Sequence, residues 1–280
     1  MTDRYDFVFS LGAACSCTQS LRAAGLQFAS FPLDWVSGSR LSARVELVAG
    51  GFAGWLDERD FDFVEKSAAF GHDTYRNRKT GLLHPHDFEK GVPISASMPA
   101  VREKYERRVS RLVSLIESSR RVLAVWIADP REPAAPDEEE ISRALAALSG
   151  RFRSTEFRML ALECANGVPL QKARRISRAG YDIISFDYAS RSPEAKPWEV
   201  DSEGILAVLS GFACADYRTP GEKKAQRARD RARERERFNA TSPWRLFVNK
   251  LEFKLWKHLK KSLERRGMAL DAPTGGGRNE

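Results

Sequence analysis

Two side chains of this sequence have the chemistry of a nucleophile and its base, namely Cys15 and His86. A cysteine attacks as the thiolate, and a neighbouring imidazole raises the thiolate fraction by taking the proton. Such a pair would attack the carbonyl carbon of an amide, an ester or a thioester. From residue types alone the simpler interpretation is that Cys15 is a small buried apolar residue and His86 belongs to a turn, because cysteine is among the most buried residue types.

The segment around Cys15 has the pattern of a strand, a tight turn and a helix. The apolar run 7–9 predicts a strand, Gly12 ends it, and helical spacing of apolar residues begins at Cys15. Cys15 is therefore predicted at a helix N-terminus, where backbone N–H groups and the helix dipole lower the pKa of a thiol. The N–H groups from Ala13 to Ser16 would then form an oxyanion hole.

The second half of the region up to residue 217 alternates strands with helices. Strands are predicted at 121–127, 157–164 and 181–187, and helices at 136–148, 170–179 and 200–212. Such alternation predicts a three-layer α/β fold, with a mainly parallel sheet and helices on both faces. Earlier in the chain we expect mostly helix over 40–70, short strands or an ordered loop carrying His84 and His86 over 72–98, and a helix from Pro99 to about Ser119.

In a parallel α/β sheet, ligands bind outside the carboxyl ends of the strands. This rule brings Gly12 and Cys15 to the same edge as three polar residues, Asp129, Asn166 and Asp187, and the long insertion can deliver His86 there. Each of the three could orient the histidine, and Asp187 is our prediction for the third catalytic residue. Asp87 is adjacent to His86 in sequence and for that reason tends to point away from it.

Further residues are candidates for binding substrate. Asp34 and Trp35 could line the site from a loop, or could be a buried anchor with an aspartate cap. Arg108 and Arg111 flank the apolar stripe of their helix, where they could hold a carboxylate or phosphate, or could form a solvated helix edge. We also expect Gly12 and Asp87 near the substrate.

The sequence contains no recognisable metal-binding or cofactor-binding motif. Cys15 and Cys17, with His84 and His86, are four soft ligands, but their spacing matches no usual zinc pattern. There is no glycine-rich nucleotide motif and no Gly-x-Ser-x-Gly elbow. We therefore predict a protein without metal or cofactor.

Several stretches together resemble a known family. They are Ser10-Leu11-Gly12-x-x-Cys15, Ser30-x-Pro32-Leu33-Asp34-Trp35, His86-Asp87-Phe88 and Tyr105-x-x-Arg108-x-x-Arg111. This combination resembles the bacterial putative papain-like cysteine peptidases, a domain-of-unknown-function family. The resemblance implies that Cys15 is the nucleophile, that His86 is the base and that the substrate is a peptide. The chain departs from the family pattern at Leu33, where Phe is usual, and at Trp126, where Arg is common. A papain-type enzyme has a helical half and a barrel-like half, so the alternation described above predicts a different fold.

Charge is distributed unevenly along the 280 residues. The net charge is +8, but residues 218–266 hold 17 Lys and Arg against 6 Asp and Glu. We expect an α/β domain over 1–217, a charged linker or helix over 218–242, a basic amphipathic helix over 243–267 and a disordered tail over 268–280. The helical segment 243–265 could pack on the domain or bind an anionic membrane surface, whereas nucleic acid is the weaker alternative because the domain has no matching basic composition.

Two functions from different classes are consistent with these features. The first is a thiol-dependent hydrolase or acyl transferase acting on a peptide or another acyl substrate. The alternative is a non-catalytic or glycan-handling accessory protein of bacterial surface-polysaccharide assembly at the inner membrane face. Four scattered cysteines, the absence of a recognisable signal peptide and the absence of a long apolar stretch favour a cytoplasmic location, peripheral on the inner membrane face if the tail binds lipid.

Overall fold

The computed structural model describes residues 2–66, 71–131, 136–190 and 199–240, together with 257, 258 and 260–262. The chain divides into two compact units, Met1–Tyr217 and Arg218–Glu280. The described strands are β1 (Asp3–Tyr5), β2 (Phe7–Ser10), β3 (Phe61–Lys66), β4 (His72–Asn77), β5 (Leu83–Glu89), β6 (Arg121–Ile127), β7 (Glu156–Cys164), β8 (Arg174–Ser177), β9 (Tyr181–Phe186) and β10 (Phe212–Cys214). The described helices are α1 (Cys15–Ala23), α2 (Leu41–Ala49), α3 (Ile94–Glu117), α4 (Glu138–Arg151), α5 (Ser202–Leu209), α6 (Pro220–Ala240) and the 3-10 turns η1 (Glu58–Asp60) and η2 (Leu170–Lys172).

A five-stranded sheet forms the centre of the first unit, in the order β2-β6-β7-β9-β8. The first four strands run parallel, and β8 pairs with β9 in the antiparallel sense. The parallel strands read as nearly continuous apolar runs because both of their faces are covered. The predicted mainly parallel sheet is confirmed.

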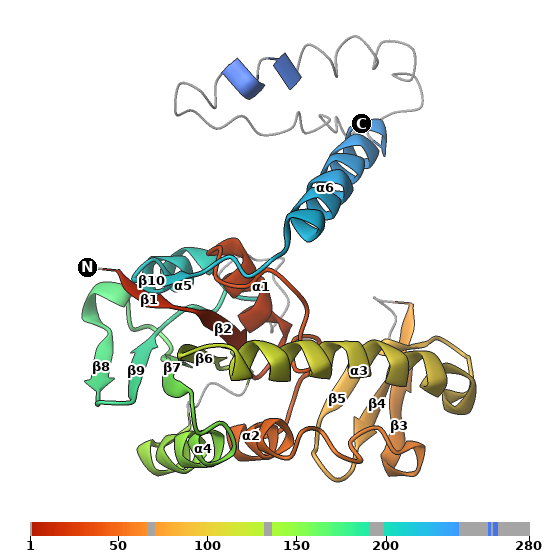
Figure 1. Cartoon of the computed structure of the whole chain (residues 1–280), viewed down its shortest axis with the longest axis horizontal. Coiled ribbons are helices and arrows are strands. Elements are labelled where there is room, and N and C mark those ends of the chain that lie inside the picture. Colours follow the sequence, from red (N-terminus) through yellow and green to blue (C-terminus); the bar gives the residue numbers. More distant parts are fainter. Residues whose placement is uncertain are drawn as a thin grey trace. The chain divides into compact units, whose positions relative to one another are not determined.

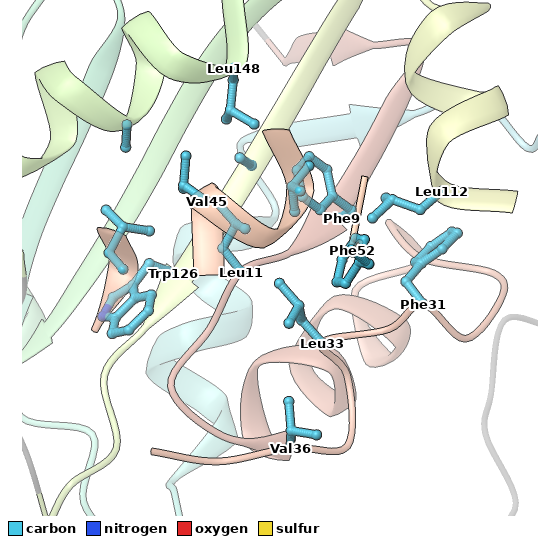
Figure 2. Packing of buried hydrophobic residues seen from close by; sticks show 14 of the residues in the cluster. Phe9, Leu11, Phe31, Leu33, Val36, Val45, Phe52, Leu112, Trp126 and Leu148 are labelled. Carbon is cyan, nitrogen blue, oxygen red and sulfur yellow. The ribbon is translucent and has the colours of Figure 1, made fainter. Parts of the chain in front are cut away.

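Helices cover both faces of this sheet (Figure 1), so the predicted three-layer arrangement is confirmed as well. Side chains of one face, such as Phe7 and Phe9, pack with α2, α3 and α4, whereas Val8, which points the other way, packs with α1 and α5. Figure 2 shows the first of these clusters, in which Phe9 and Leu11 lie among side chains of α2, α3 and the loop after α1. The alternation along β2 follows from the two-residue period of a strand.

The insertion between α2 and α3 forms a separate antiparallel sheet in the order β3-β4-β5. Ser37, in the loop after α1, exchanges two backbone hydrogen bonds with Leu83 at the start of β5, with N···O distances of 3.0 and 2.8 Å. This bridge ties the loop that follows Cys15 and α1 to the strand that carries His86. Strands β4 and β5 agree with the first of the two alternatives for 72–98, short strands or an ordered loop.

Three regions differ from the predictions. Residues 170–179 form the turn η2 and strand β8 instead of a helix, because Ile176 pairs with Ile183 at the edge of the sheet while Arg174 and Arg175 stay exposed. The segment 40–70 is only partly helical, since Phe61–Lys66 is strand β3. Helix α3 also begins five residues before Pro99, which lies inside it.

In the second unit, the charged run forms helix α6. Its start is capped reciprocally, because the Glu222 carboxylate accepts from the Thr219 backbone N–H at 2.8 Å and the Thr219 hydroxyl accepts from the Glu222 N–H at 3.2 Å. The predicted basic helix and disordered tail fall almost entirely outside the described residues. Among the described helices, none combines the length and the apolar character needed to cross a membrane.

Candidate active site

Cys15 is the first residue of α1, at the carboxyl end of the edge strand β2. The preceding residue, Ala14, has extended backbone and no side chain that could cap the helix. The backbone N–H groups of Cys15 and Ser16 lie near the Cys15 sulfur and act to lower the pKa of the thiol. The thiol is partly exposed. The predicted position at a helix N-terminus is thus found in the structure.

The expected low pKa of this thiol is not found. Burial raises the pKa of Cys15 above its ordinary value, and the nearby negative charge of Asp129 raises it further. The two backbone N–H groups and the Arg131 guanidinium lower the pKa, but their combined effect is smaller. Cys15 is therefore a neutral thiol at pH 7.

Asp129 follows β6, the strand beside β2, and is buried. Arg131 neutralises it with a two-point contact, in which Nε donates to Oδ1 at 2.9 Å and Nη2 donates to Oδ2 at 2.5 Å. Arg131 has half of its side chain exposed. This ion pair is the charged group that lies beside Cys15, and the sequence analysis had singled out only its acid.

Asn166 and Asp187 lie further along the same edge. The Asp187 carboxylate accepts the backbone N–H groups of Gly167 and Ala189, at 2.9 and 3.1 Å, and so joins the loops after β7 and β9. Asn166 is exposed in the first of these loops. Strand β9 is the third strand from β2 in the sheet. The carboxyl ends of these two strands, which Asp187 and Cys15 follow, are therefore roughly 14 Å apart across the sheet.

Gly12 is required by packing. A Cβ at this position would lie 2.3 Å from the Cβ of Cys17 and 2.7 Å from its sulfur, which is too close for any side chain. Cys17 is fully buried, and its thiol lies 3.5 Å from the carbonyl oxygen of Val125. Gly12 thus lets α1 approach β2 and sets the position of the helix start.

His86 lies on β5 and faces the loop after α1. Its ring is half-buried and edge-on to the Trp35 indole, with the centroids 6.4 Å apart, and the His72 ring lies at 6.5 Å. The Arg22 guanidinium, from the end of α1, covers the Trp35 ring at 5.4 Å. Burial lowers the pKa of His86, and the Asp87 charge opposes this without reversing it. His86 is therefore a neutral imidazole at pH 7, the form that accepts a proton.

Asp87 points into a buried network and not toward a ligand. Its carboxylate accepts from His84 Nδ1 at 2.7 Å, from the Tyr105 hydroxyl at 2.7 Å and from Lys104 Nζ at 2.5 Å. Burial acts to raise the pKa of Asp87, but the hydrogen bonds and charges of His84 and Lys104 outweigh burial and hold it well below its usual range. The network fixes the backbone next to His86 and joins β5 to α3.

Asp34 is completely buried, which agrees with the interpretation as a capping aspartate. Its Oδ2 accepts the Phe31 backbone N–H and the Gln27 amide, both at 2.7 Å, and Arg22 Nη2 lies 3.9 Å away. Burial raises the pKa of Asp34 to about 6. Asp34 thus fixes the loop after α1, whereas its neighbour Trp35 is partly exposed to solvent.

Arg108 and Arg111 both lie on α3, and Arg111 contacts the loop after α1. The Arg108 guanidinium stacks on the Tyr105 ring at 5.2 Å, and its Nη1 is buried with no hydrogen-bond partner among the described residues. Arg111 Nη1 donates to the carbonyl oxygen of Ser30 at 3.2 Å. Of the two, Arg108 keeps a donor without a partner in the described part of the chain, and this donor is closed to solvent.

Arg44 is a residue that sequence reasoning missed. It lies on α2, is fully buried, and donates Nη2 to the carbonyl oxygens of Ala13 and Gly38, at 3.1 and 2.7 Å. Burial lowers its pKa to about 9, so it remains a cation at pH 7. Arg44 thus anchors the backbone two residues before Cys15. A charged residue in an amphipathic helix is ordinarily solvated, and for that reason the sequence gives no sign of this role.

The predicted site residues form two groups in the structure. Gly12, Cys15 and Asp129 follow the carboxyl ends of the neighbouring strands β2 and β6. A second group surrounds Trp35 and His86, and Arg22 connects α1 to it. Within the described parts of the chain, no cluster of three or more His, Cys, Asp or Glu residues could hold a metal ion.

Comparison with known proteins identifies the family. The family described as putative papain-like cysteine peptidase (DUF1796) matches residues 6–167. The chain belongs to this family. The match includes Cys15, Trp35, His86 and Asp129 but ends before Asp187. Neither the curated proteins nor the solved structures contain a match to the chain.

Proposed function

We propose that this member of the putative papain-like cysteine peptidase family is a thiol-dependent hydrolase, with Cys15 as nucleophile and His86 as general base. The observation that carries the proposal is the uncapped start of α1, where two backbone N–H groups act on a partly exposed thiol. Such groups stabilise the thiolate during attack and the oxyanion that forms next. The family description makes a peptide the first substrate to consider.

The raised pKa of Cys15 and the lowered pKa of His86 define the form of the mechanism. At pH 7 both groups are neutral, so the proposal requires that Cys15 and His86 come together on the bound substrate and that the proton then moves from sulfur to imidazole as the sulfur–carbon bond forms. The imidazolium then returns this proton to the leaving amine as the carbon–nitrogen bond breaks. Water, deprotonated by His86, cleaves the resulting thioester and regenerates the thiol.

The acid that acts on His86 is Asp87, through its charge and by fixing the backbone of β5. We therefore assign Asp87 a positioning role and leave the predicted Asp187 outside the reacting group. Asp129 and Arg131 lie beside Cys15, where the guanidinium can contact the carboxyl side of a bound peptide.

The proposal is tested with a peptidyl vinyl sulfone, a probe that alkylates a cysteine only when a base activates it. Labelling at neutral pH is mapped by mass spectrometry in the wild type, in His86→Ala and in the control His258→Ala, which changes an exposed histidine outside the site. We expect labelling at Cys15, a loss of about tenfold or more in His86→Ala and no change in His258→Ala. Cys214, the other partly exposed cysteine, serves as the internal reference thiol. Equal labelling of Cys15 in His86→Ala would exclude His86 as the base, and a Cys15 no more reactive than Cys214 would exclude the thiol enzyme.

A further inference from the structure

Helix α6 of the second unit is strongly basic and has no apolar face. Between Lys223 and Arg235 the sequence has seven Lys and Arg against two Asp and Glu, and it has no apolar side chain larger than alanine. The side chains of five arginines in this stretch are exposed, namely Arg227, Arg229, Arg231, Arg233 and Arg235. The helix therefore lacks the apolar surface needed to pack on a core or to lie in a lipid interface.

The basic residues of α6 are spaced so that they repel one another. Intervals of four residues separate Lys223, Arg227, Arg231 and Arg235, and the same interval separates Arg229 from Arg233. Residues four apart are neighbours on the surface of a helix, and like charges at this spacing destabilise it. A solvated charged helix is ordinarily stabilised by an acid at these positions, so the spacing in α6 requires an anion from elsewhere to neutralise it.

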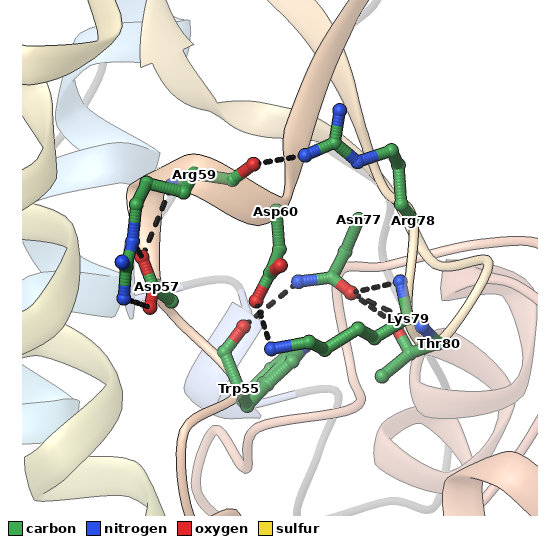
Figure 3. Close-up of polar contacts among 8 residues, drawn as sticks. All are labelled: Trp55, Asp57, Arg59, Asp60, Asn77, Arg78, Lys79 and Thr80. Carbon is green, nitrogen blue, oxygen red and sulfur yellow. Dashed lines mark hydrogen bonds and ion pairs between the residues drawn. The ribbon is translucent and has the colours of Figure 1, made fainter.

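The first unit shows how an arginine is neutralised within the protein. Arg59 donates Nε and Nη2 to the Asp57 carboxylate at 3.0 and 2.6 Å (Figure 3). In α6, by contrast, the Asp230 carboxylate accepts from the Gln226 amide at 2.8 Å. None of the five exposed arginines of α6 forms an ion pair with a side chain that the structure describes. Their charges stay available to a partner that carries several anions.

The five arginines lie in two stripes on opposite sides of α6. Four residues advance a helix by one turn and about 40°, whereas two residues advance it by about 200°. The first stripe is therefore Arg227, Arg231 and Arg235, and the second stripe, on the opposite side, is Arg229 and Arg233. By the same count, Ala228 and Ala232 lie on a side between the stripes, and Asp230 lies on the side opposite these alanines.

This arrangement fits the major groove of duplex DNA. The groove of B-DNA is about 12 Å wide and admits an α-helix, whose diameter with side chains is about 10–12 Å. Phosphates of the two strands border the groove, so a helix within it needs positive charge on two opposite sides. The side between these two faces the bases and has to be small, and the side away from the bases can carry an acid. The 21 residues of α6 are about 31 Å long, which corresponds to about nine base pairs.

We propose that α6 binds duplex DNA by lying in its major groove. The first stripe contacts the phosphates of one strand, the second stripe contacts those of the other, and the alanine side faces the bases. The DNA supplies the anions that the sequence of α6 omits. The composition of residues 1–217 does not favour nucleic acid, so the contact is assigned to α6, and it is independent of the thiol chemistry proposed above.

The test measures binding of a fluorescein-labelled DNA duplex of mixed sequence and about 20 base pairs to the full chain, by fluorescence anisotropy at several salt concentrations. Five phosphate contacts predict a slope of about −4.5 for log K against log[salt], which is a loss of about 500-fold between 50 and 200 mM salt. A duplex RNA of the same length and sequence is the matched probe. Its major groove is deep and narrow, so we expect it to bind about tenfold more weakly than the DNA.

Two variants examine the stripes separately. Replacing all three arginines of the first stripe by glutamine, which keeps helix propensity, should make the slope shallower by about 2.7, and Arg229→Gln with Arg233→Gln should make it shallower by about 1.8. The matched control removes three exposed charges from the first unit through Lys172→Gln, Arg174→Gln and Arg175→Gln, and it should leave the slope unchanged.

Several outcomes would overturn the proposal. An unchanged slope in either stripe variant would show that the two sides of α6 are not both on phosphates. Equal binding of duplex RNA, tighter binding to phosphatidylserine vesicles than to DNA, or no binding of DNA at 50 mM salt would exclude the major groove as the partner surface. Cys15→Ser is expected to bind DNA as the wild type does, which separates this result from the fate of the thiol mechanism.

Discussion

The start of α1 and the junction of β5 with α3 contrast in how their polar groups are satisfied. At the junction, the Asp87 carboxylate receives three donors from two elements. At the start of α1, Ala14 provides no cap and the buried Ser16 hydroxyl has no partner among the described residues. A saturated buried network holds elements in place, whereas open donors at a helix start are available to a reacting group. The contrast therefore separates a saturated network that holds elements in place from a helix start with open donors, where the proposed nucleophile Cys15 lies.

The largest effect on stability is expected from a substitution in the Asp87 network, where the carboxylate receives three donors. Asp87→Asn leaves His84 and Lys104 facing an amide and removes a buried charge that both of them stabilise. We expect the free energy of unfolding at pH 7 to fall by about 3 to 5 kcal/mol, the range for breaking a buried ion pair. Urea unfolding followed by circular dichroism measures this change.

The pH dependence sharpens this prediction. The pKa of Asp87 in the folded protein lies below its unfolded value, so its contribution is fully present above about pH 4 and is lost as pH falls toward the folded pKa. The stability difference between wild type and Asp87→Asn should therefore shrink in acid. Glu103→Gln is the control, because Glu103 forms an exposed pair with Arg107 on the same helix and should change stability by less than about 0.5 kcal/mol. A difference that stays constant with pH would show that Asp87 acts by shape alone.

Asp34 is expected to give a smaller effect of opposite sign. Its folded pKa of about 6 exceeds the ordinary value, so the folded state binds the proton more tightly and loses stability as pH rises from about 4 to 6. A shift of roughly two pKa units corresponds to about 3 kcal/mol. Asp34→Asn cannot titrate, so the stability of wild type relative to this variant should decrease by up to about 3 kcal/mol between pH 4 and pH 7. Parallel curves for the two proteins would contradict the raised pKa.

The sequence predicts the fold well wherever local pattern and burial agree. Strand β6 is a continuous apolar run that only a two-sided sheet can cover, and α4 begins with Asp137 as a cap followed by three glutamates that suit its dipole. Strand β8 was predicted as helix because a short segment with one apolar residue has no decisive period. Its strand conformation depends on β9, which the chain reaches only afterwards.

The candidate site is less accessible to sequence reasoning, because its energetics depend on distant partners. The helix start predicted a low pKa for Cys15, but burial and the charge of Asp129 reverse the direction. Arg44 gives no local sign that it holds the carbonyl of Ala13. For Asp87, the expectation that it points away from His86 agrees with its contact to His84, yet the partners from α3 were not foreseen.

The smallest effect on stability is expected from a substitution at the start of α1, where donors lack partners. Ser16 lies next to Cys15 and is buried, but its hydroxyl makes no hydrogen bond with any described residue. Ser16→Ala removes an unsatisfied polar group and adds helix propensity, so the free energy of unfolding should stay within about 0.5 kcal/mol of wild type or rise slightly. Urea unfolding measures this, and vinyl sulfone labelling of Cys15 should also stay unchanged, since the backbone N–H of residue 16 remains. A loss of labelling with normal stability would instead assign the Ser16 hydroxyl to the oxyanion hole. Ser16 would then belong, with Cys15, to the reacting part of the proposed site.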